Sequence, residues 1–282
     1  MTNLANKAAP GAIRQPAQAD PQAASAPDGG GQRRVMALVM DAGSTLLENG
    51  GEVFRVQQTM TIMAQSLGLR GFHVYVLTNG IFGSAEADGA TEVRHLPAVS
   101  IHLGRVERVN ALSRQVAAGR CDLAGAEREL AAIRALPNYR GSVRLLAAAT
   151  GAACFAWLFG GNLAAIPVAF LAGAAELALT AAFQRRRISR IFSDIAAAAC
   201  GTALVLLAAA AVPGVDTNAA IIGALMVLTP GVALVMGIRD FINADYLSGT
   251  IRLIDAVLIA GSLAVGVGFT YTVWRAVTGV VL

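Results

Sequence analysis

The chain has 282 residues, of which 55% are hydrophobic and only 14% are charged, and its formal net charge is +4. Soluble domains carry about a quarter charged residues. Most of the charged residues here lie before Arg144, and the chain after it is too apolar for a soluble domain. Nucleic-acid binding is not indicated, because no basic face with interleaved aromatic residues occurs. The composition therefore predicts a polytopic membrane protein.

The N-terminal segment, residues 1–34, predicts a disordered tail. It holds four prolines and the run DGGGQRR, and it has no apolar periodicity. It also lacks the apolar core of a signal peptide, so we expect it to stay in the cytosol. A transit peptide is the alternative, because the segment contains Ala and Arg and few acids.

A cytosolic α+β domain is predicted over residues 35–138. Apolar residues recur at helical spacing from Val35, and again in a second helix that stops at Gly68. Later in the domain, a basic helix is expected over 100–119, and the helix that follows has Asp122 as its N-cap.

Between these two pairs of helices the apolar period changes to two, which predicts strands. Asn-Gly and Asp-Gly dipeptides suit tight hairpins, so we expect turns at Asn79-Gly80 and Asp88-Gly89. The prediction is a small three-stranded antiparallel sheet over 72–78, 81–86 and 91–96.

Residues 139–282 predict a membrane domain with five spans. Each span is close to the roughly 20 residues that cross a bilayer, and the spans cover 143–159, 163–183, 195–212, 219–238 and 251–274. The loop QRRRISR (184–190) is the strongest positive cluster in this half, so the positive-inside rule places it and the loop 239–252 in the cytosol. An odd number of spans then puts the C-terminus outside.

Glu176 is a charged residue well inside the second predicted span. A charge at that depth costs about 2.5–3.5 kcal/mol on insertion scales, so it usually faces a cavity or a partner. It shares a helix face with small residues such as Gly173, which suits close helix contact. The functional hypothesis is a carboxylate that couples to a proton or a substrate, and the alternative is a protonated or hydrogen-bonded side chain that joins two helices.

Three aspartates, Asp194, Asp240 and Asp255, lie near the cytosolic ends of the third, fourth and fifth spans. Together with Glu176 they could line a vestibule that faces the cytosol. The alternative is that they are solvated at the interface, with Arg252 and Asp255 paired one helical turn apart.

Pro230 interrupts the fourth predicted span. It cannot donate the helical hydrogen bond to the carbonyl of Met226, and unwound backbone at membrane depth persists only where protein or a water-filled cavity satisfies it. Thr229 adds a hydroxyl at the same level. In transporters such breaks present bare carbonyls and half-helix ends to substrates and ions; a simple proline kink is the alternative.

Two blocks of the sequence resemble the threonine/serine exporter family. The first block joins ENGGEVFRVQQTMTIMAQSLGL to VYVLTNGIFGSA, and the second is LTPGVALVMGIRDFINADYLSGTIRLIDAVLIAGSLAVGVG. The resemblance covers residues 35–275 in the right order. It implies gradient-driven export of small hydrophilic metabolites, such as threonine, serine or dicarboxylates including succinate, across a bacterial inner (cell) membrane.

The length and the five predicted spans are similar to those of the larger subunit of the family's split form. That resemblance implies a smaller membrane subunit as partner and a carboxylate-bearing substrate. It leaves a higher oligomer open, and no cofactor, metal or nucleic acid is expected.

The candidate site residues fall into two groups. The substrate or coupling candidates, which include positions that match the family pattern, are Glu176, Asp194, Thr229, Pro230, Gly231, Asp240, Asp245, Arg252 and Asp255. The candidates in the cytosolic domain match the family pattern and are Glu52, Arg55 and Thr78. For Glu52 and Arg55, three residues apart at a helix start, pairing with each other or capping is the alternative.

Two other functions remain open at this point, a membrane-anchored enzyme and a membrane protein that senses a small metabolite. The sequence shows no phosphate-binding loop, no metal-ligand set and no nucleophile motif, which disfavours the enzyme. Turnover by the soluble domain alone would favour an enzyme, and binding without flux would favour a sensor.

Overall fold

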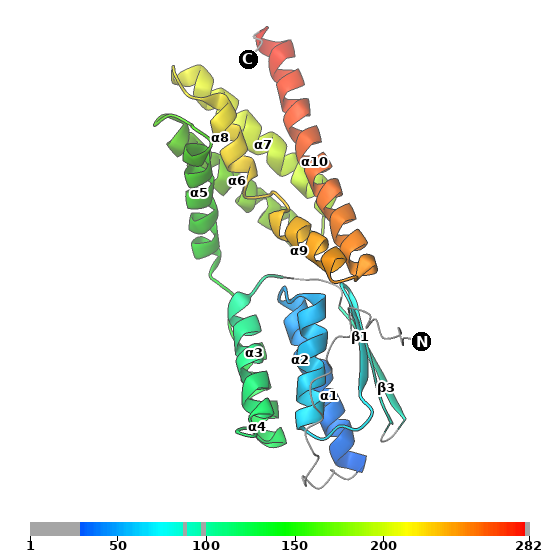
Figure 1. Cartoon of the computed structure of the whole chain (residues 1–282). Helices are drawn as coiled ribbons and strands as arrows, with labels where there is room; N and C mark the ends of the chain where they lie inside the picture. Colours follow the sequence, from blue (N-terminus) through cyan, green and yellow to red (C-terminus); the bar gives the residue numbers. More distant parts are fainter. Residues whose placement is uncertain (1–28, 87–88, 97–99, 280–282) are drawn as a thin grey trace, which may run out of the picture.

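The computed structural model describes residues 29–86, 89–96 and 100–279, which form an α+β domain and a bundle of long helices (Figure 1). The domain consists of α1 (Gly29–Glu48), α2 (Val53–Ser66), β1 (His73–Leu77), β2 (Gly80–Ala85), β3 (Ala90–His95), α3 (Leu103–Ala117) and α4 (Leu123–Arg134). The bundle consists of α5 (Gly141–Leu158), α6 (Ala165–Arg185), α7 (Arg190–Ala211), α8 (Thr217–Leu225), α9 (Gly231–Ile242) and α10 (Tyr246–Thr278). The predicted fold class, a helical membrane protein with a small antiparallel sheet in its N-terminal part, is confirmed.

The domain is built on one hydrophobic core that α1 shares with its neighbours. The three strands lie in the order β1-β2-β3, all antiparallel. The absence of a side chain at Gly83 lets β2 approach α1, because a β-carbon there would lie only 2.6 Å from Sδ of Met40. On the other face, Tyr75, Phe82 and Val93 are exposed neighbours on adjacent strands.

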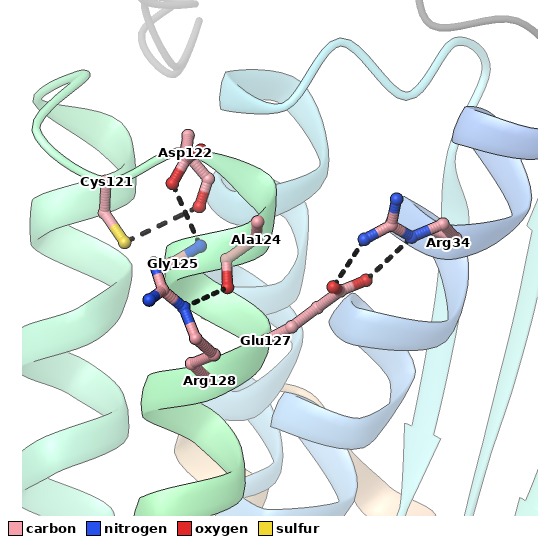
Figure 2. Close-up of polar contacts among 7 residues, drawn as sticks. All are labelled: Arg34, Cys121, Asp122, Ala124, Gly125, Glu127 and Arg128. Carbon is pink, nitrogen blue, oxygen red and sulfur yellow. Dashed lines mark hydrogen bonds and ion pairs between the residues drawn. The ribbon is translucent and has the colours of Figure 1, made fainter.

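One polar contact caps α4 and another joins it to α1 (Figure 2). The Asp122 carboxylate accepts a hydrogen bond from the N–H of Gly125 at 2.9 Å, which confirms the predicted N-cap. Across the helices, Nη2 of Arg34 in α1 lies 2.6 Å from Oε2 of Glu127 in α4. This pair ties the first turns of α1 to the rest of the domain.

The boundaries of two predicted elements differ from those observed. Helix α1 begins at Gly29, inside the segment predicted to be disordered, while residues 1–28 lie outside the described part. The first hairpin turn is Thr78-Asn79, because Leu77 pairs directly with Gly80. Asp88, expected in the second turn, also lies outside the described residues.

The segment between α4 and α5 is held to the domain through α3. The guanidinium of Arg105 donates hydrogen bonds to the carbonyl of Leu136 and, at 3.3 Å, to Oδ1 of Asn49. The His102 ring stacks on Tyr139 with ring centroids 5.3 Å apart. The linker between the domain and the bundle is therefore held by contacts with the domain.

Helices α5, α6, α7 and α10 are long and apolar enough to cross a membrane. The chain runs back and forth through the bundle, and its C-terminal end lies at the end far from the α+β domain (Figure 1). Small residues let the helices approach closely: a β-carbon at Gly223 in α8 would lie 2.6 Å from the backbone nitrogen of Ala156 in α5.

The fourth predicted span, residues 219–238, is not one helix. It is divided into α8 and α9, and residues 226–230 between them are not helical. The predicted loop 239–252 is also wrong in length, since α9 runs to Ile242 and α10 begins at Tyr246. Between α7 and α10 the chain thus passes through the bundle in two half-helices.

Candidate functional site

The break between α8 and α9 leaves backbone groups without partners. The N–H of Thr229 bonds to the carbonyl of Leu225 at 3.0 Å, and the Thr229 hydroxyl donates to the same oxygen. Among the described residues, no donor reaches the carbonyl oxygens of Met226, Val227 and Leu228. The carbonyl predicted to be free, that of Met226, is free because Pro230 has no N–H.

Helix α8 is too short to cross the apolar layer before the chain breaks. Helix α8 has nine residues, and at 1.5 Å per residue it spans about 14 Å, roughly half of a hydrocarbon core of about 30 Å. Leu225 and Leu228 pack against Ile259 and Leu263 of α10. A β-carbon at Gly173 in α6 would lie 3.4 Å from Cγ2 of Val227. The unwound segment therefore packs against neighbouring helices on one side, while Thr229 is exposed.

A cavity of about 570 Å³ opens beside the break, between the bundle and the α+β domain. We call it the break cavity. The bundle contributes polar or backbone-exposing residues from the break, α9 and α10, and the domain contributes the first hairpin turn. Thr229 and Pro230 of the break line the cavity. Its other polar residues are Thr78, Asn79, Arg190, Arg252 and Asp255.

Arg252 is presented to this cavity by a buried partner on α9. Its Nε lies 3.0 Å from Oδ2 of Asp240, whose side chain is 2% exposed, whereas that of Arg252 is 15% exposed. The predicted pair of Arg252 with Asp255 is wrong, because α9 packs along α10 and brings Asp240 to the guanidinium. Asp255 is exposed and lines the cavity without an ion pair among the described residues.

Asp194 is also buried rather than solvated. Its Oδ2 lies 3.7 Å from Nε of Arg190, one helical turn earlier on α7. Arg190 lines the break cavity and pairs with the more buried Asp194, as Arg252 lines it and pairs with the more buried Asp240. The alternative of solvated interfacial acids thus fails for Asp194 and Asp240.

A second cavity of about 540 Å³ lies between α2 and α9, and we call it the side cavity. Gly231, at the start of α9, lines it. Oε1 of Glu52 lies 2.6 Å from Nε of Arg239, and Oε2 of Glu52 lies 3.5 Å from Nε of Arg55. The alternative of a local Glu52–Arg55 pair is correct, but it omits Arg239. No local sequence rule connects positions 52 and 239.

Glu176 lies apart from these cavities, between α6 and α7. Its side chain is fully buried, and neither carboxylate oxygen has a hydrogen-bond partner among the described residues. A β-carbon at Gly201 in α7 would overlap the carboxylate, so the glycine makes room for it. The hydroxyl of Thr202 in α7 is likewise buried without a partner. A hydrogen-bonded staple between helices is therefore not observed.

Asp245 has a structural role, because it accepts a hydrogen bond from the N–H of Ser248 at 3.2 Å and caps α10.

Thr78 lines the break cavity, and its hydroxyl has no partner among the described residues. Over residues 29–86, 89–96 and 100–279, no three His, Cys, Asp or Glu side chains gather to hold a metal ion.

The chain matches the ThrE family, described as "Putative threonine/serine exporter", over residues 37–274. It belongs to this family. Comparisons with curated proteins and with solved structures gave no match. Membership of ThrE and the long apolar helices identify a multi-pass membrane protein of the threonine/serine exporter type.

In this ThrE chain, replacement of Asp240 by Ala tests the buried pair. We expect Asp240→Ala to lower the free energy of unfolding by about 3 kcal/mol, because it leaves a largely buried guanidinium uncompensated. The exposed Asp255→Ala is the matched control and should change it by less than about 0.5 kcal/mol.

The measurement is unfolding of the detergent-purified chain in increasing sodium dodecyl sulfate. In the double variant Asp240→Ala/Arg252→Ala, part of the loss should be recovered, because no charge is left unpaired. Equal losses for Asp240→Ala and Asp255→Ala would contradict the pairing.

Proposed function

We propose that the chain is a subunit of a secondary-active exporter of small hydrophilic metabolites, and that the break cavity is its substrate site. Membership of the threonine/serine exporter family supports the general activity. The observation that carries the site is the combination of bare backbone groups at a helix break with Arg252 and Asp255 in one cavity.

One side of the cavity suits a carboxylate. Helix α9 begins at Gly231, and among the described residues the N–H groups of Val232 and Ala233 have no acceptor. Both residues line the cavity with Arg252 and Arg190. A helix N-terminus carries a partial positive charge and free donors, so it adds to the guanidinium groups in binding an anion.

The other side suits a cation. The unpaired carbonyls of Met226, Val227 and Leu228 follow the C-terminal end of α8, where the helix dipole is negative. Asp255 adds a carboxylate to the same cavity. A zwitterionic amino acid therefore fits better than a dicarboxylate, whose second carboxylate would meet oxygen atoms. The hydroxyls of Thr78 and Thr229 suit a hydroxyl-bearing side chain.

The cavity would open to the cytosol. Arg190, next to the arginine-rich segment 185–187, lines the same cavity as Thr78 of the α+β domain, so the positive cluster and the domain lie on one side. The positive-inside rule favours the cytosol for that side. We further propose the bacterial inner membrane as location and a smaller membrane subunit of the same family as partner, in a split transporter.

We assign proton coupling to Glu176. A buried, unpartnered carboxylate in a membrane helix is a natural site for a proton, and Val227 in the break contacts α6 one turn away, at Gly173. Glu176→Gln keeps the shape and removes the ionisable group, so uptake into inverted vesicles should lose its response to an imposed pH gradient. A normal gradient response in this variant would exclude Glu176 from coupling.

Pro230→Ala tests the substrate site. The alanine supplies the missing N–H, so α8 and α9 can join and the break cavity should close. Uptake of threonine or serine should fall by about tenfold or more, which corresponds to about 1.4 kcal/mol of lost binding. The matched control is Pro167→Ala in the first turn of α6, where proline removes no helical bond, and its uptake should stay normal.

The assay is gradient-driven uptake into inverted vesicles that contain the chain alone or with its partner subunit, for threonine, serine and succinate. Uptake of threonine or serine over succinate supports the zwitterion site. Unchanged uptake in Pro230→Ala would contradict that site, and no flux with the partner confirmed in the complex would favour a sensor or an enzyme.

A further inference from the structure

The Glu52 carboxylate is held between two arginines at the boundary of domain and bundle. Its two oxygens contact different guanidinium groups, Oε1 that of Arg239 and Oε2 that of Arg55. The Glu52 side chain is only 10% exposed, whereas Arg239 is 54% exposed and Arg55 is 66% exposed. The arrangement is that of a carboxylate bound by two arginines that remain accessible from solvent.

This contact is distinctive because little else joins the two parts of the chain. Arg239 lies on α9, and Glu52 and Arg55 lie at the start of α2. Among the ion pairs between described residues, no other connects the α+β domain with the bundle. A change at Glu52 would therefore act directly on how the domain meets α9.

The side cavity leaves room for a ligand at this place. Glu52, Arg55 and Arg239 line it, and Asn110 of α3 adds an amide. Gly50, Val232 and Met236 line both this cavity and the break cavity, so the two adjoin along the first turns of α9.

We infer that Arg55 and Arg239 form an outer carboxylate-binding subsite, which Glu52 occupies here and which a substrate carboxylate takes over on its way to the break cavity. The ligand class is any small carboxylate, because a guanidinium fork recognises the carboxylate rather than the rest of the molecule. The inference rests on the proposed function for its physiological ligand.

In the exchange one carboxylate replaces another on the same arginines, so both guanidinium groups keep a carboxylate partner, while Glu52 must move into water. The exchange has a structural consequence, since displacing Glu52 breaks the ion pair between the domain and α9. Arrival of substrate is thereby linked to loosening of the domain over the cavities.

Binding of L-threonine and of succinate to the purified full-length chain, measured by calorimetry, tests the subsite. Glu52→Gln removes the internal competitor and should lower the dissociation constant of both probes, by about threefold to tenfold for a contact between partly exposed charges. Arg239→Gln should raise it by a similar factor. The control is Glu127→Gln, at the exposed pair with Arg34 between α4 and α1, and it should change nothing (Figure 2).

A purely structural Glu52 predicts no tightening, because loss of the ion pair would then weaken binding or leave it unchanged. The subsite is overturned if wild type, Glu52→Gln and Arg239→Gln bind the probes with equal affinity. It is also overturned if neither wild type nor Glu52→Gln binds them. If the three chains bind with equal affinity but the wild type still takes up substrate in vesicles, the proposed exporter function stands and the subsite does not. Tighter binding in Glu52→Gln without wild-type uptake supports the subsite and overturns the proposed function.

Discussion

The loss of one backbone hydrogen bond, at Pro230, is the constraint on which the membrane part depends. Without an N–H at this position the segment between α7 and α10 loses a helical hydrogen bond, and it is divided into α8 and α9 with unpaired carbonyls between them. Unpaired backbone is tolerated in a membrane only inside protein or beside a water-filled cavity. The packing of Leu225 and Leu228 on α10, and the cavity on the other side, meet this requirement.

Helix α9 is positioned by charges on both of its sides. Arg239 pairs with Glu52 of the domain, while the next residue, Asp240, pairs with Arg252 of α10. Both cavities lie along the first turns of this helix. A movement of α9 would therefore change the contact with the domain, the placement of Arg252 and the shape of the break at once, which is how a small domain could influence a site in the bundle.

Local rules predicted much of this from the sequence, and tertiary contacts explain what they missed. The three-stranded antiparallel sheet, the Asp122 cap, the free carbonyl of Met226 and the Glu52–Arg55 pair follow from neighbouring residues. The rule for residues one turn apart paired Arg252 with Asp255, but Asp240 is the partner because α9 folds back along α10. Arg239 could not be linked to Glu52 for the same reason.

Accessibility of Thr229 is the most direct test that the break is a substrate site. Thr229→Cys would be made in a chain whose Cys121, Cys154 and Cys200 are replaced by serine, and labelled with a membrane-impermeant maleimide in vesicles of both orientations. The account predicts labelling only from the face that carries the α+β domain, and slower labelling in the presence of threonine. A labelling rate that threonine does not change would contradict it.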